Sequence, residues 1–345
     1  MRIERVAAPG PEWDQFVDGC PGATLAHARA WLEVVHEAYG LEPHGLIARD
    51  ERGEVCGVLP LVRMRGLRGA AELVSMPFLD TGGPLAKDPA TARALVEQAL
   101  ALARELRVGA VDLRAVTPIA GVAATDFAER LDLHLPLLAD VEAQWKALPA
   151  KVRNQTRKAE REGLRLLDDA ADPLAAFYEP FLVNMRDLGS PVHGRRFYQA
   201  MARAFGERLR FVVTADGGRP VGGLVAIDHA GVVTVPWAST LRSERARCPN
   251  NQIYWEAIRW AIARGARELD FGRSPRDSGT HHFKRGWGAL ERRLAWTRLS
   301  PDGATLAPAL PGESTLLRAL SRAWQRLPVS VTARLGPPIR RRISS

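Results

Sequence analysis

The sequence has few of the features that mark secreted or membrane-spanning proteins. Its 345 residues include only three cysteines, which lie far apart and show neither metal-ligand nor disulfide spacing. There is no apolar run of about 18 residues or more, so no spanning helix is expected. The first residues, MRIERVAAPGPEWDQF, lack the apolar segment of a signal peptide. We therefore expect a cytoplasmic protein.

Lysine is also scarce. The chain carries 48 Lys and Arg residues and a net charge of +9, but only five of these residues are lysines. The excess positive charge is concentrated in residues 141–165 and in the tail from Pro301 onward. Such basic segments favour an anionic partner such as a phosphate, a nucleic acid or a membrane surface, or they are solvated helix faces.

The chain contains an internal repeat. Residues 44–64 and 210–229 each contain two apolar runs around a charged turn, as in a β-hairpin. A segment with helical periodicity follows each hairpin, at 88–106 and 249–265, and a short strand follows each helix. The two units lie about 160 residues apart, which makes Asp112 the counterpart of Asp270.

This repeat predicts an α/β (α+β) chain of two similar domains, each with a mixed β-sheet flanked by helices. We place the first domain at 1–140, the second at 141–300 and a basic amphipathic tail at 301–345. Ligands of such sheets bind beyond the carboxyl ends of the strands. Asp270 stands at the end of a strand, so we expect Asp270–Gly288 to form a strand followed by a loop that faces a cleft.

The triplet Asp270-Phe271-Gly272 also occurs in protein kinases, but the chain has neither the glycine-rich loop nor the His-Arg-Asp loop of a kinase. Adjacent histidines, as at His281 and His282, would point to opposite faces of a strand, and no further ligand spacing is present. We therefore expect no metal site.

Several motifs together resemble the FemAB family, the aminoacyl transferases that add amino acids to peptidoglycan precursors and contain two acetyltransferase-like (GNAT) domains. The resemblance extends from Trp31 to Leu299 and is similar to the branch found with exosortase and exopolysaccharide gene clusters. It rests on GVLPL (57–61), SMPFLDTGG (75–83), KVRNQTRKAEREGL (151–164), NMRDLGSPV (184–192), VPWAST (235–240) and DFGRSPRDSGTHHFKRGWGA (270–289).

The resemblance implies transfer of an acyl or aminoacyl group to an amine of a cell-envelope precursor related to peptidoglycan or exopolysaccharide. It implies aminoacyl-tRNA as donor and no metal or organic cofactor. A GNAT-type enzyme that uses acyl-CoA is a second hypothesis, but neither repeat helix is preceded by the glycine-rich loop that binds the CoA pyrophosphate. A non-catalytic scaffold in a polysaccharide assembly complex is a third hypothesis, and a nucleic-acid binder is a fourth.

Lys284 matches the lysine of the family motif and is the catalytic candidate. Its ammonium would act on a phosphate or on the oxyanion that develops during acyl transfer. The substrate-binding candidates are polar or aromatic residues in the same motifs: Asp80, Arg153, Asn154, Lys158, Arg186, Trp237, Asp270, Arg273, Ser274, Phe283 and Trp287. Asp80 would hold the acceptor amine in a cleft between the domains, and the basic helix around Arg153 would contact the donor's phosphates.

The tail contains a second candidate surface. Its leucines at 316, 317, 320 and 327 and Trp324 recur at helical spacing, beside Arg318, Arg322 and Arg326. This pattern predicts a basic amphipathic helix that either docks on the protein or lies on an anionic membrane. A peripheral contact with the inner face of the membrane, through residues 313–345, is therefore one expectation.

Overall fold

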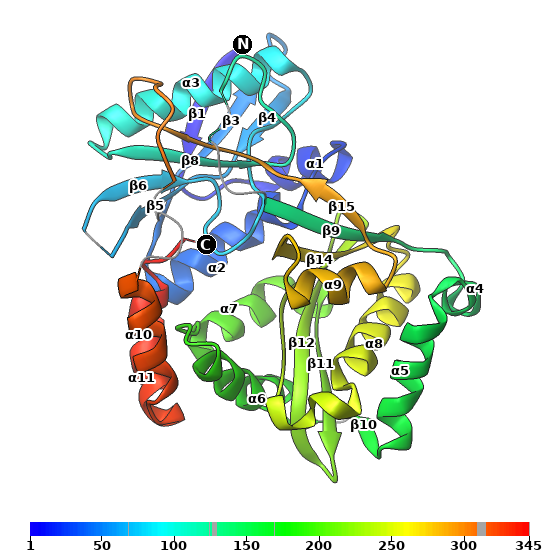
Figure 1. The fold of residues 1–345 in the computed structure, drawn as a ribbon. Helices are drawn as coiled ribbons and strands as arrows, with labels where there is room; N and C mark the ends of the chain where they lie inside the picture. The colour runs from blue at the N-terminus through cyan, green and yellow to red at the C-terminus, as the bar shows by residue number, and fades with distance from the viewer. Residues whose placement is uncertain (68, 124, 126–129, 169, 309–314, 345) are drawn as a thin grey trace. The chain divides into compact units, whose positions relative to one another are not determined.

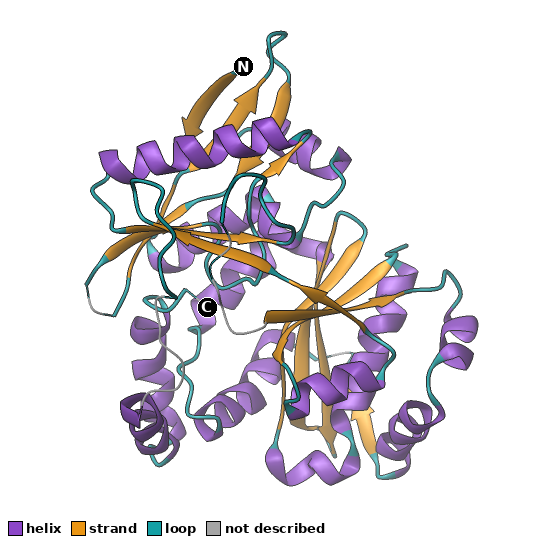
Figure 2. Ribbon diagram, turned by 45° about the horizontal axis from the view of Figure 1, so that its top comes forward, coloured by secondary structure: helices purple, strands orange, loops and turns teal. Residues whose placement is uncertain are grey.

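The computed structural model describes residues 1–67, 69–123, 125, 130–168, 170–308 and 315–344, and the chain forms two compact units. Unit 1 contains residues 1–130, 293–311 and 339–345, and unit 2 contains residues 131–292 and 312–338. Each unit contains β-sheet flanked by helices, as the repeat predicts. Figure 2 shows helices and strands in both units.

Unit 1 has two sheets, with strand orders β1-β3-β4-β7 and β16-β8-β6-β5-β2. The strands are β1 (Arg2–Val6), β2 (Glu42–Pro43), β3 (Gly45–Arg49), β4 (Val55–Leu59), β5 (Val62–Arg65), β6 (Ala71–Val74), β7 (Leu85–Ala86), β8 (Ala110–Ala115) and β16 (Ala295–Leu299). The helices are α1 (Pro11–Gly19), a 3₁₀ turn at Leu25–His27, α2 (Arg29–Tyr39) and α3 (Pro89–Glu105). Helix α3 packs on β3 and β4 through Leu95, Ala99 and Leu102, as the periodicity predicts (Figure 1).

Unit 2 has one seven-stranded sheet of order β10-β11-β12-β13-β14-β9-β15. Its strands are β9 (Arg130–Pro136), β10 (Leu164–Leu166), β11 (Leu209–Asp216), β12 (Arg219–His229), β13 (Val232–Thr240), β14 (Glu268–Pro275) and β15 (Leu290–Arg293). Its helices are α4 (Val141–Ala147), α5 (Ala150–Arg161), α6 (Pro173–Asp187), α7 (Arg195–Phe205), α8 (Pro249–Ala263), α9 (Gly279–Gly286), α10 (Thr315–Gln325) and α11 (Val329–Arg340), with 3₁₀ turns at Gly206–Arg208 and Arg242–Arg247.

The unit 2 sheet has helices on both faces (Figure 1). Leu224 of β12 belongs to the core cluster that α8 forms with Ala257 and Ala261. On the other face, Gly223 of β12 faces α6, because a Cβ atom added to this glycine would lie 3.3 Å from the Phe177 ring. Neighbouring residues of a strand point to opposite faces, so α8 and α6 cover opposite sides of the sheet.

The domain bounds differ from those expected at 140 and 300. Strand β9 precedes residue 141 but stands beside β14 in the sheet of unit 2. Strand β16 lies before the expected bound at 300 but pairs antiparallel with β8 of unit 1, with Arg298 opposite Asp112. Each Asp-bearing strand therefore has one neighbouring strand that lies outside the expected domain range, which a local sequence pattern does not reveal.

The tail is also divided between the units. Residues 312–338 belong to unit 2, and residues 339–345 to unit 1, where the Phe78 amide donates to the Ser344 carbonyl over 2.7 Å. Among the described residues, no helix is both long and apolar enough to cross a bilayer. The side chain of Leu316 lies outside the described residues.

Candidate active site

The candidate site of unit 2 begins where two parallel strands separate. Strands β13 and β14 pair only from Val232 opposite Glu268 to Thr234 opposite Asp270. Beyond that pair β13 continues along β12 up to Thr240, whereas β14 continues to Pro275 without pairing with β13. Asp270 is thus the last residue of β14 that pairs with β13, at the carboxyl side of a fork between these parallel strands. Ligands of α/β sheets bind at such openings.

A tight turn fixes the Asp270 carboxylate. The Gly272 amide donates to Asp270 Oδ1 over 2.6 Å, and Gly272 has a φ of +71°, in the left-handed region that favours glycine. The Asp-Phe-Gly triplet therefore forms a side-chain-to-backbone turn at the end of a strand. Its glycine is needed for that conformation.

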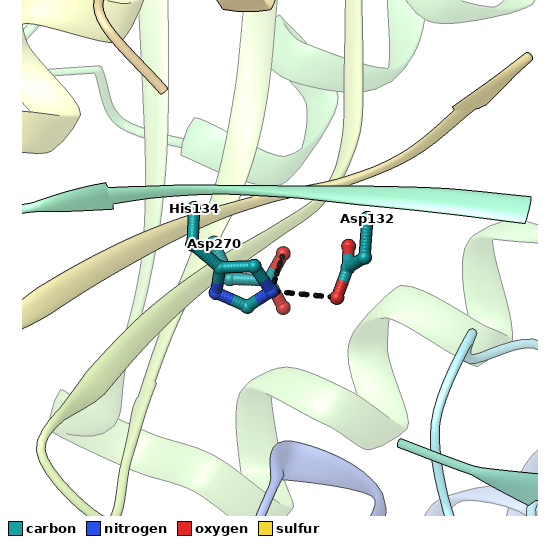
Figure 3. A group of neighbouring side chains, drawn as sticks. All are labelled: Asp132, His134 and Asp270. Atoms are coloured by element: carbon teal, nitrogen blue, oxygen red, sulfur yellow. Dashed lines mark hydrogen bonds and ion pairs between the residues drawn. The ribbon is translucent and has the colours of Figure 1, made fainter. Parts of the chain in front are cut away.

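Strand β9 brings further charged groups to Asp270 (Figure 3). Asp132 Oδ2 accepts a hydrogen bond from His134 Nε2 over 2.7 Å, and the same nitrogen lies 3.9 Å from Asp270 Oδ1. His134 Nδ1 is bonded to Glu268, and the Arg292 guanidinium donates to Asp132 Oδ2 over 3.1 Å. Three carboxylates and two cations thus form one largely buried network.

These neighbours shift the ionisation of the network. Burial, and then the Asp132 carboxylate, raise the pKa of Asp270 to about 7. Burial alone would lower the pKa of His134, but its hydrogen bonds to Asp132 and Glu268 outweigh burial and raise that pKa to about 10. Burial would raise the pKa of Asp132, yet the bond from His134 holds it below its usual range. The bonds to carboxylates thus favour the charged form of His134, and burial beside Asp132 raises the pKa of Asp270 into the neutral range.

Asp132, His134 and Asp270 could also be considered as metal ligands, because each places a ligand atom within 4.8 Å of the others. A ligating histidine must be neutral, however, and here both ring nitrogens are bonded to carboxylates. The Arg292 guanidinium also occupies one oxygen of Asp132. These contacts suit a network that holds protons better than one that holds a divalent ion.

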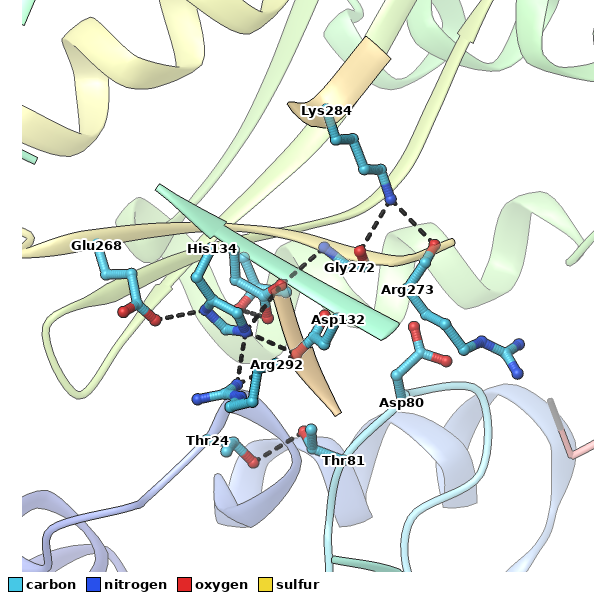
Figure 4. A network of polar contacts seen from close by, with 12 residues as sticks. Thr24, Asp80, Thr81, Asp132, His134, Glu268, Gly272, Arg273, Lys284 and Arg292 are labelled. Atoms are coloured by element: carbon cyan, nitrogen blue, oxygen red, sulfur yellow. Dashed lines mark hydrogen bonds and ion pairs between the residues drawn. The ribbon is translucent and has the colours of Figure 1, made fainter. Parts of the chain in front are cut away.

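Lys284 is buried and faces the backbone of the same strand (Figure 4). Its ammonium donates to the carbonyl oxygens of Gly272 and Arg273 over 2.9 and 3.0 Å. Lys284 thereby holds the strand segment that carries the Asp270 turn. These contacts favour a positioning role, and its expected action on an oxyanion or a phosphate stays a prediction.

The expected loop after Asp270 is wrong in part, because the segment continues as strand to Pro275 and then forms helix α9, capped by the Ser278 hydroxyl, which accepts from the His281 amide over 3.2 Å. The two histidines therefore lie on a helix and not on a strand. His281 is buried beside Glu291, with 3.0 Å between Nε2 and Oε1, whereas His282 is exposed.

Of the two aromatic candidates, Trp287 lies in the core and Phe283 is partly buried against it. Trp287 is only 1% exposed, and Phe283 packs against it and against Tyr254 at centroid distances of 6.2 and 5.3 Å. Phe271 completes the group, 5.2 Å from Tyr254. These rings stabilise the packing of α8 and α9 under β14.

Ser274 follows directly after the Gly272–Arg273 pair that Lys284 holds, and it is also buried. Its hydroxyl has no hydrogen-bond partner among the described residues. A buried hydroxyl without a partner is unfavourable, and such groups are found at functional sites. Ser274 therefore remains a candidate substrate contact, together with Asp270 and the half-buried Arg273.

Arg186 and Trp237 make structural contacts within unit 2. Arg186 is paired with Asp187 over 2.6 Å and donates to the Leu327 carbonyl over 3.4 Å. Trp237 lies edge-on to Phe197 and Tyr198, each with a centroid distance of 5.6 Å. Neither contact involves the Asp270 network.

The basic helix expected around Arg153 is α5. Arg153 donates to the carbonyls of Lys146 and Leu148 over 2.7 and 2.9 Å, so it caps the end of α4. Asn154 is exposed and Lys158 is half-buried. Contact of this helix with a donor's phosphates stays a prediction.

Unit 1 contains a corresponding fork with different chemistry. Strands β6 and β8 pair in parallel up to Val74 opposite Asp112. Arg298 contacts both Asp112 and Glu72, over 3.1 and 2.8 Å. Here a guanidinium stands where unit 2 has a histidine and a further carboxylate, so Asp112 is occupied by a structural ion pair.

Asp80 lies in unit 1, in the SMPFLDTGG segment that follows β6. The segment is held by buried Arg114, which donates to the carbonyls of Met76 and Leu79 over 3.2 and 2.6 Å. Met76 and Phe78 have φ values of 64° and 72°, which are strained for residues with side chains. The structure presents Asp80 half-buried on this segment, and its binding of an amine stays a prediction.

The sequence patterns did not single out Asp132, His134 or Arg292. A signal was present in LDLHLP (131–136), where Asp132 and His134 alternate with leucines that enter the core. Two polar residues on one side of an otherwise apolar strand indicate a buried polar cluster.

Comparison with known proteins agrees with this description. Residues 148–285 match the acetyltransferase (GNAT) domain family, within unit 2. Among solved structures, the fold is similar to that of FemX, at 13% identity over 86% of this chain and 96% of that one, with a TM-score of 0.65. It is also similar to a tandem GNAT protein from the clavulanic acid biosynthesis pathway, at 14% identity over 87% and 98% of the two chains, with a TM-score of 0.55.

A third similar structure is L-PGS from Bacillus licheniformis, at 12% identity over 93% of this chain and 98% of that one, with a TM-score of 0.52. No curated protein matches the chain in sequence. The fold is thus that of two tandem GNAT-like domains: the sequence repeat predicts the two similar domains, and the family resemblance implies their GNAT fold.

Proposed function

We propose that the chain is an N-acyltransferase of the FemAB kind, which forms an amide on an amine of a cell-envelope precursor, with the fork of unit 2 as its reaction site. The observation that carries the proposal is the position of Asp270 at the last residue pair of β13 and β14, beside Asp132 and His134. The match of residues 148–285 to the GNAT family supports the same unit as the reaction site.

The proposed chemistry starts with removal of a proton from the acceptor's ammonium group by the Asp270 carboxylate. The free amine attacks the donor's carbonyl carbon, the carbonyl oxygen becomes an oxyanion, and the bond to the leaving oxygen or sulfur breaks. The amine's second proton goes to the leaving group, so the products are an amide and a free alcohol or thiol. A base with a pKa near the working pH is effective in such a step.

The network also explains how Asp270 is held ready for this role. His134 is hydrogen-bonded to both Glu268 and Asp132, which fixes its ring. Its Nε2 atom lies 3.9 Å from Asp270 Oδ1, so the charge of the ring acts on Asp270 without a hydrogen bond between them. The Gly272 turn orients the carboxylate, and Lys284 fixes Gly272 and Arg273. Asp132, His134 and Lys284 are therefore proposed as positioning residues.

The proposed donor is an aminoacyl-tRNA, and acyl-CoA is the competitor. The segment before α8, Arg242 to Cys248, contains no glycine, although the short loops that bind a CoA pyrophosphate are glycine-rich. It does contain Arg242 and Arg245, which suit a polyanionic donor, whereas Arg247 is paired with Asp216 and Glu244. The proposed setting is the cytoplasm, at the inner face of the membrane, with no metal or organic cofactor.

The test is mass spectrometry of envelope precursors from strains with and without the gene, combined with transfer assays on the purified protein. Precursors from the wild type should carry an added acyl or aminoacyl group that is absent without the gene. In the assays, charged tRNA should support transfer to an extract of these precursors, and acetyl-CoA should not. Transfer from acetyl-CoA alone would assign the chain to CoA-dependent enzymes, and identical precursors in both strains would favour a scaffold.

A further inference from the structure

We propose that helices α10 and α11 form a surface that binds an anionic lipid bilayer. This inference goes beyond the proposed reaction and rests on a different part of the chain. Residues 315–344 contain no aspartate or glutamate. They contain seven arginines, at positions 318, 322, 326, 334, 340, 341 and 342. A segment with charge of only one sign complements the negative surface of a bilayer that contains anionic lipids.

The same helices expose large apolar side chains. Leu320 of α10 is 57% exposed and Leu335 of α11 is 48% exposed, while Leu317 is 40% exposed. On α10, Leu317 and Leu320 are three residues apart and therefore share a face, whereas Arg318 and Arg322 are four residues apart on a different side. Arg326 follows directly after the helix. This is the pattern of a helix that lies in a membrane interface, with leucines inserted and arginines beside the headgroups.

The two helices are held on unit 2 through close contacts of small residues. Gly189 lies so close to α10 that a Cβ atom added to it would be only 2.7 Å from the Ser321 carbonyl oxygen. Gly336 of α11 is equally close to unit 2, because a Cβ atom added to it would lie 3.0 Å from the Val192 amide nitrogen. Arg186 adds a bond to the Leu327 carbonyl. The helices are thus docked through Ser321 and Gly336, and Leu320 and Leu335 stay exposed.

These observations favour a bilayer over a nucleic acid as the partner. Arginines alone would suit either polyanion. Exposed leucines gain nothing from phosphates and lose contact with water when they enter an acyl-chain boundary, which favours binding. The combination of both residue types on α10 and α11 therefore selects a lipid surface.

The experiment is flotation of the purified full-length protein with vesicles of phosphatidylcholine alone or mixed with phosphatidylglycerol. The full chain is needed because Ser344 is bonded to Phe78 in unit 1, so a truncation would disturb both units. We expect binding to the mixed vesicles, at least tenfold weaker binding to neutral vesicles, and weakening by salt. Two variants should each reduce binding at least tenfold: Leu320→Glu with Leu335→Glu, and Arg322→Glu with Arg326→Glu and Arg334→Glu.

Two matched control variants carry the same types of substitution at exposed positions outside α10 and α11. Leu67 and Leu138 are 51% and 47% exposed, and their change to Glu should leave binding unaltered. Reversal of the exposed Arg52, Arg65 and Arg93 to Glu alters the net charge by the same amount and should have little effect. If a variant fails to fold, hydrogen exchange of the wild type settles the question, since vesicles should slow exchange in residues 315–338.

The proposal is overturned if the wild type does not float with mixed vesicles. It is also overturned if both α10–α11 variants bind like the wild type, or if the controls lose binding equally. Binding of tRNA that depends on Arg322, Arg326 and Arg334, without flotation, would assign the surface to nucleic acid.

Discussion

Asp112 and Asp270 occupy the same position in two separate sheets: each is the third and last residue of a parallel strand pair. Their surroundings differ in charge. Asp112 is held by the Arg298 guanidinium at 3.1 Å, whereas Asp270 lies near a second carboxylate, Asp132, and a histidine at 3.9 Å. One fold thus presents an ion-paired carboxylate in unit 1 and a carboxyl group with a pKa raised to about 7 in unit 2.

The first prediction concerns pH. Asp270 must be deprotonated to accept a proton, so kcat/KM should rise as pH increases through about 7 and level off above it. Removing the Asp132 charge in Asp132→Asn should move this inflection to lower pH, because that carboxylate raises the pKa of Asp270. Removing the His134 cation in His134→Gln should move it to higher pH.

A pH–rate profile of the three proteins checks this prediction. Thermal unfolding of each variant is the control, because both substitutions disturb a buried hydrogen-bonded pair. Inflections that stay at the same pH in all three proteins would contradict the assignment of the titrating group to Asp270.

The second prediction concerns Lys284. Lys284→Met leaves the carbonyls of Gly272 and Arg273 without their donor, which should lower the free energy of unfolding by about 1–3 kcal/mol. Activity should fall as well, because the Asp270 turn loses its support. Lys284→Arg should recover stability only in part, since a planar guanidinium does not reproduce a compact ammonium.

Denaturant unfolding and turnover measured together separate the two roles of this lysine. If Lys284 acted only on a developing oxyanion, Lys284→Met would unfold like the wild type while turnover fell about 100- to 1000-fold. That outcome would restore the role expected from the sequence and remove the positioning role.

The third prediction concerns the turn at Gly272. Its φ of +71° makes Gly272→Ala unfavourable by about 1–2 kcal/mol, and the shift of the backbone should displace the Asp270 carboxylate. Gly286→Ala is the matched control, because Gly286 lies in α9 and has open space around it. Turnover should fall in the first variant and stay near the wild-type value in the second. Equal turnover in both would show that the turn does not matter for the reaction.

The fourth prediction concerns metals. His134 has both nitrogens engaged by carboxylates and Arg292 engages Asp132, so turnover should not depend on a divalent ion. Dialysis against a chelator should leave the rate unchanged, and added Mg²⁺, Mn²⁺ or Zn²⁺ should not raise it. A rate that is lost with the chelator and restored by one ion would make Asp132, His134 and Asp270 metal ligands instead.

The parts of the fold that sequence patterns predict are the local ones. The hairpins, helices α3 and α8, and the strands that carry Asp112 and Asp270 follow from apolar periodicity within short segments. Helix α9 does not follow from its sequence, because segment 279–286 begins and ends with glycine and has poor helix propensity, although Ser278 provides a cap at its start.

The network around Asp270 could not be predicted from local patterns, because its members come from distant parts of the chain. His134 and Glu268 are 134 residues apart, and Arg292 and Asp132 are 160 apart. They meet only because β9 takes its place beside β14, across the expected domain bound at residue 140. The strand order of a sheet is a property of the whole chain, and no single segment encodes it.

Formation of the acylated precursor by an Asp270→Asn variant tests the central claim most directly. In a deletion strain, the wild-type gene and an Asp112→Asn variant should restore the acylated precursor measured by mass spectrometry. Asp270→Asn, of matched thermal stability, should reduce its rate of formation about 100- to 10,000-fold, the usual effect of removing a general base. Full restoration by Asp270→Asn would contradict the account and remove the fork of unit 2 as the reaction site.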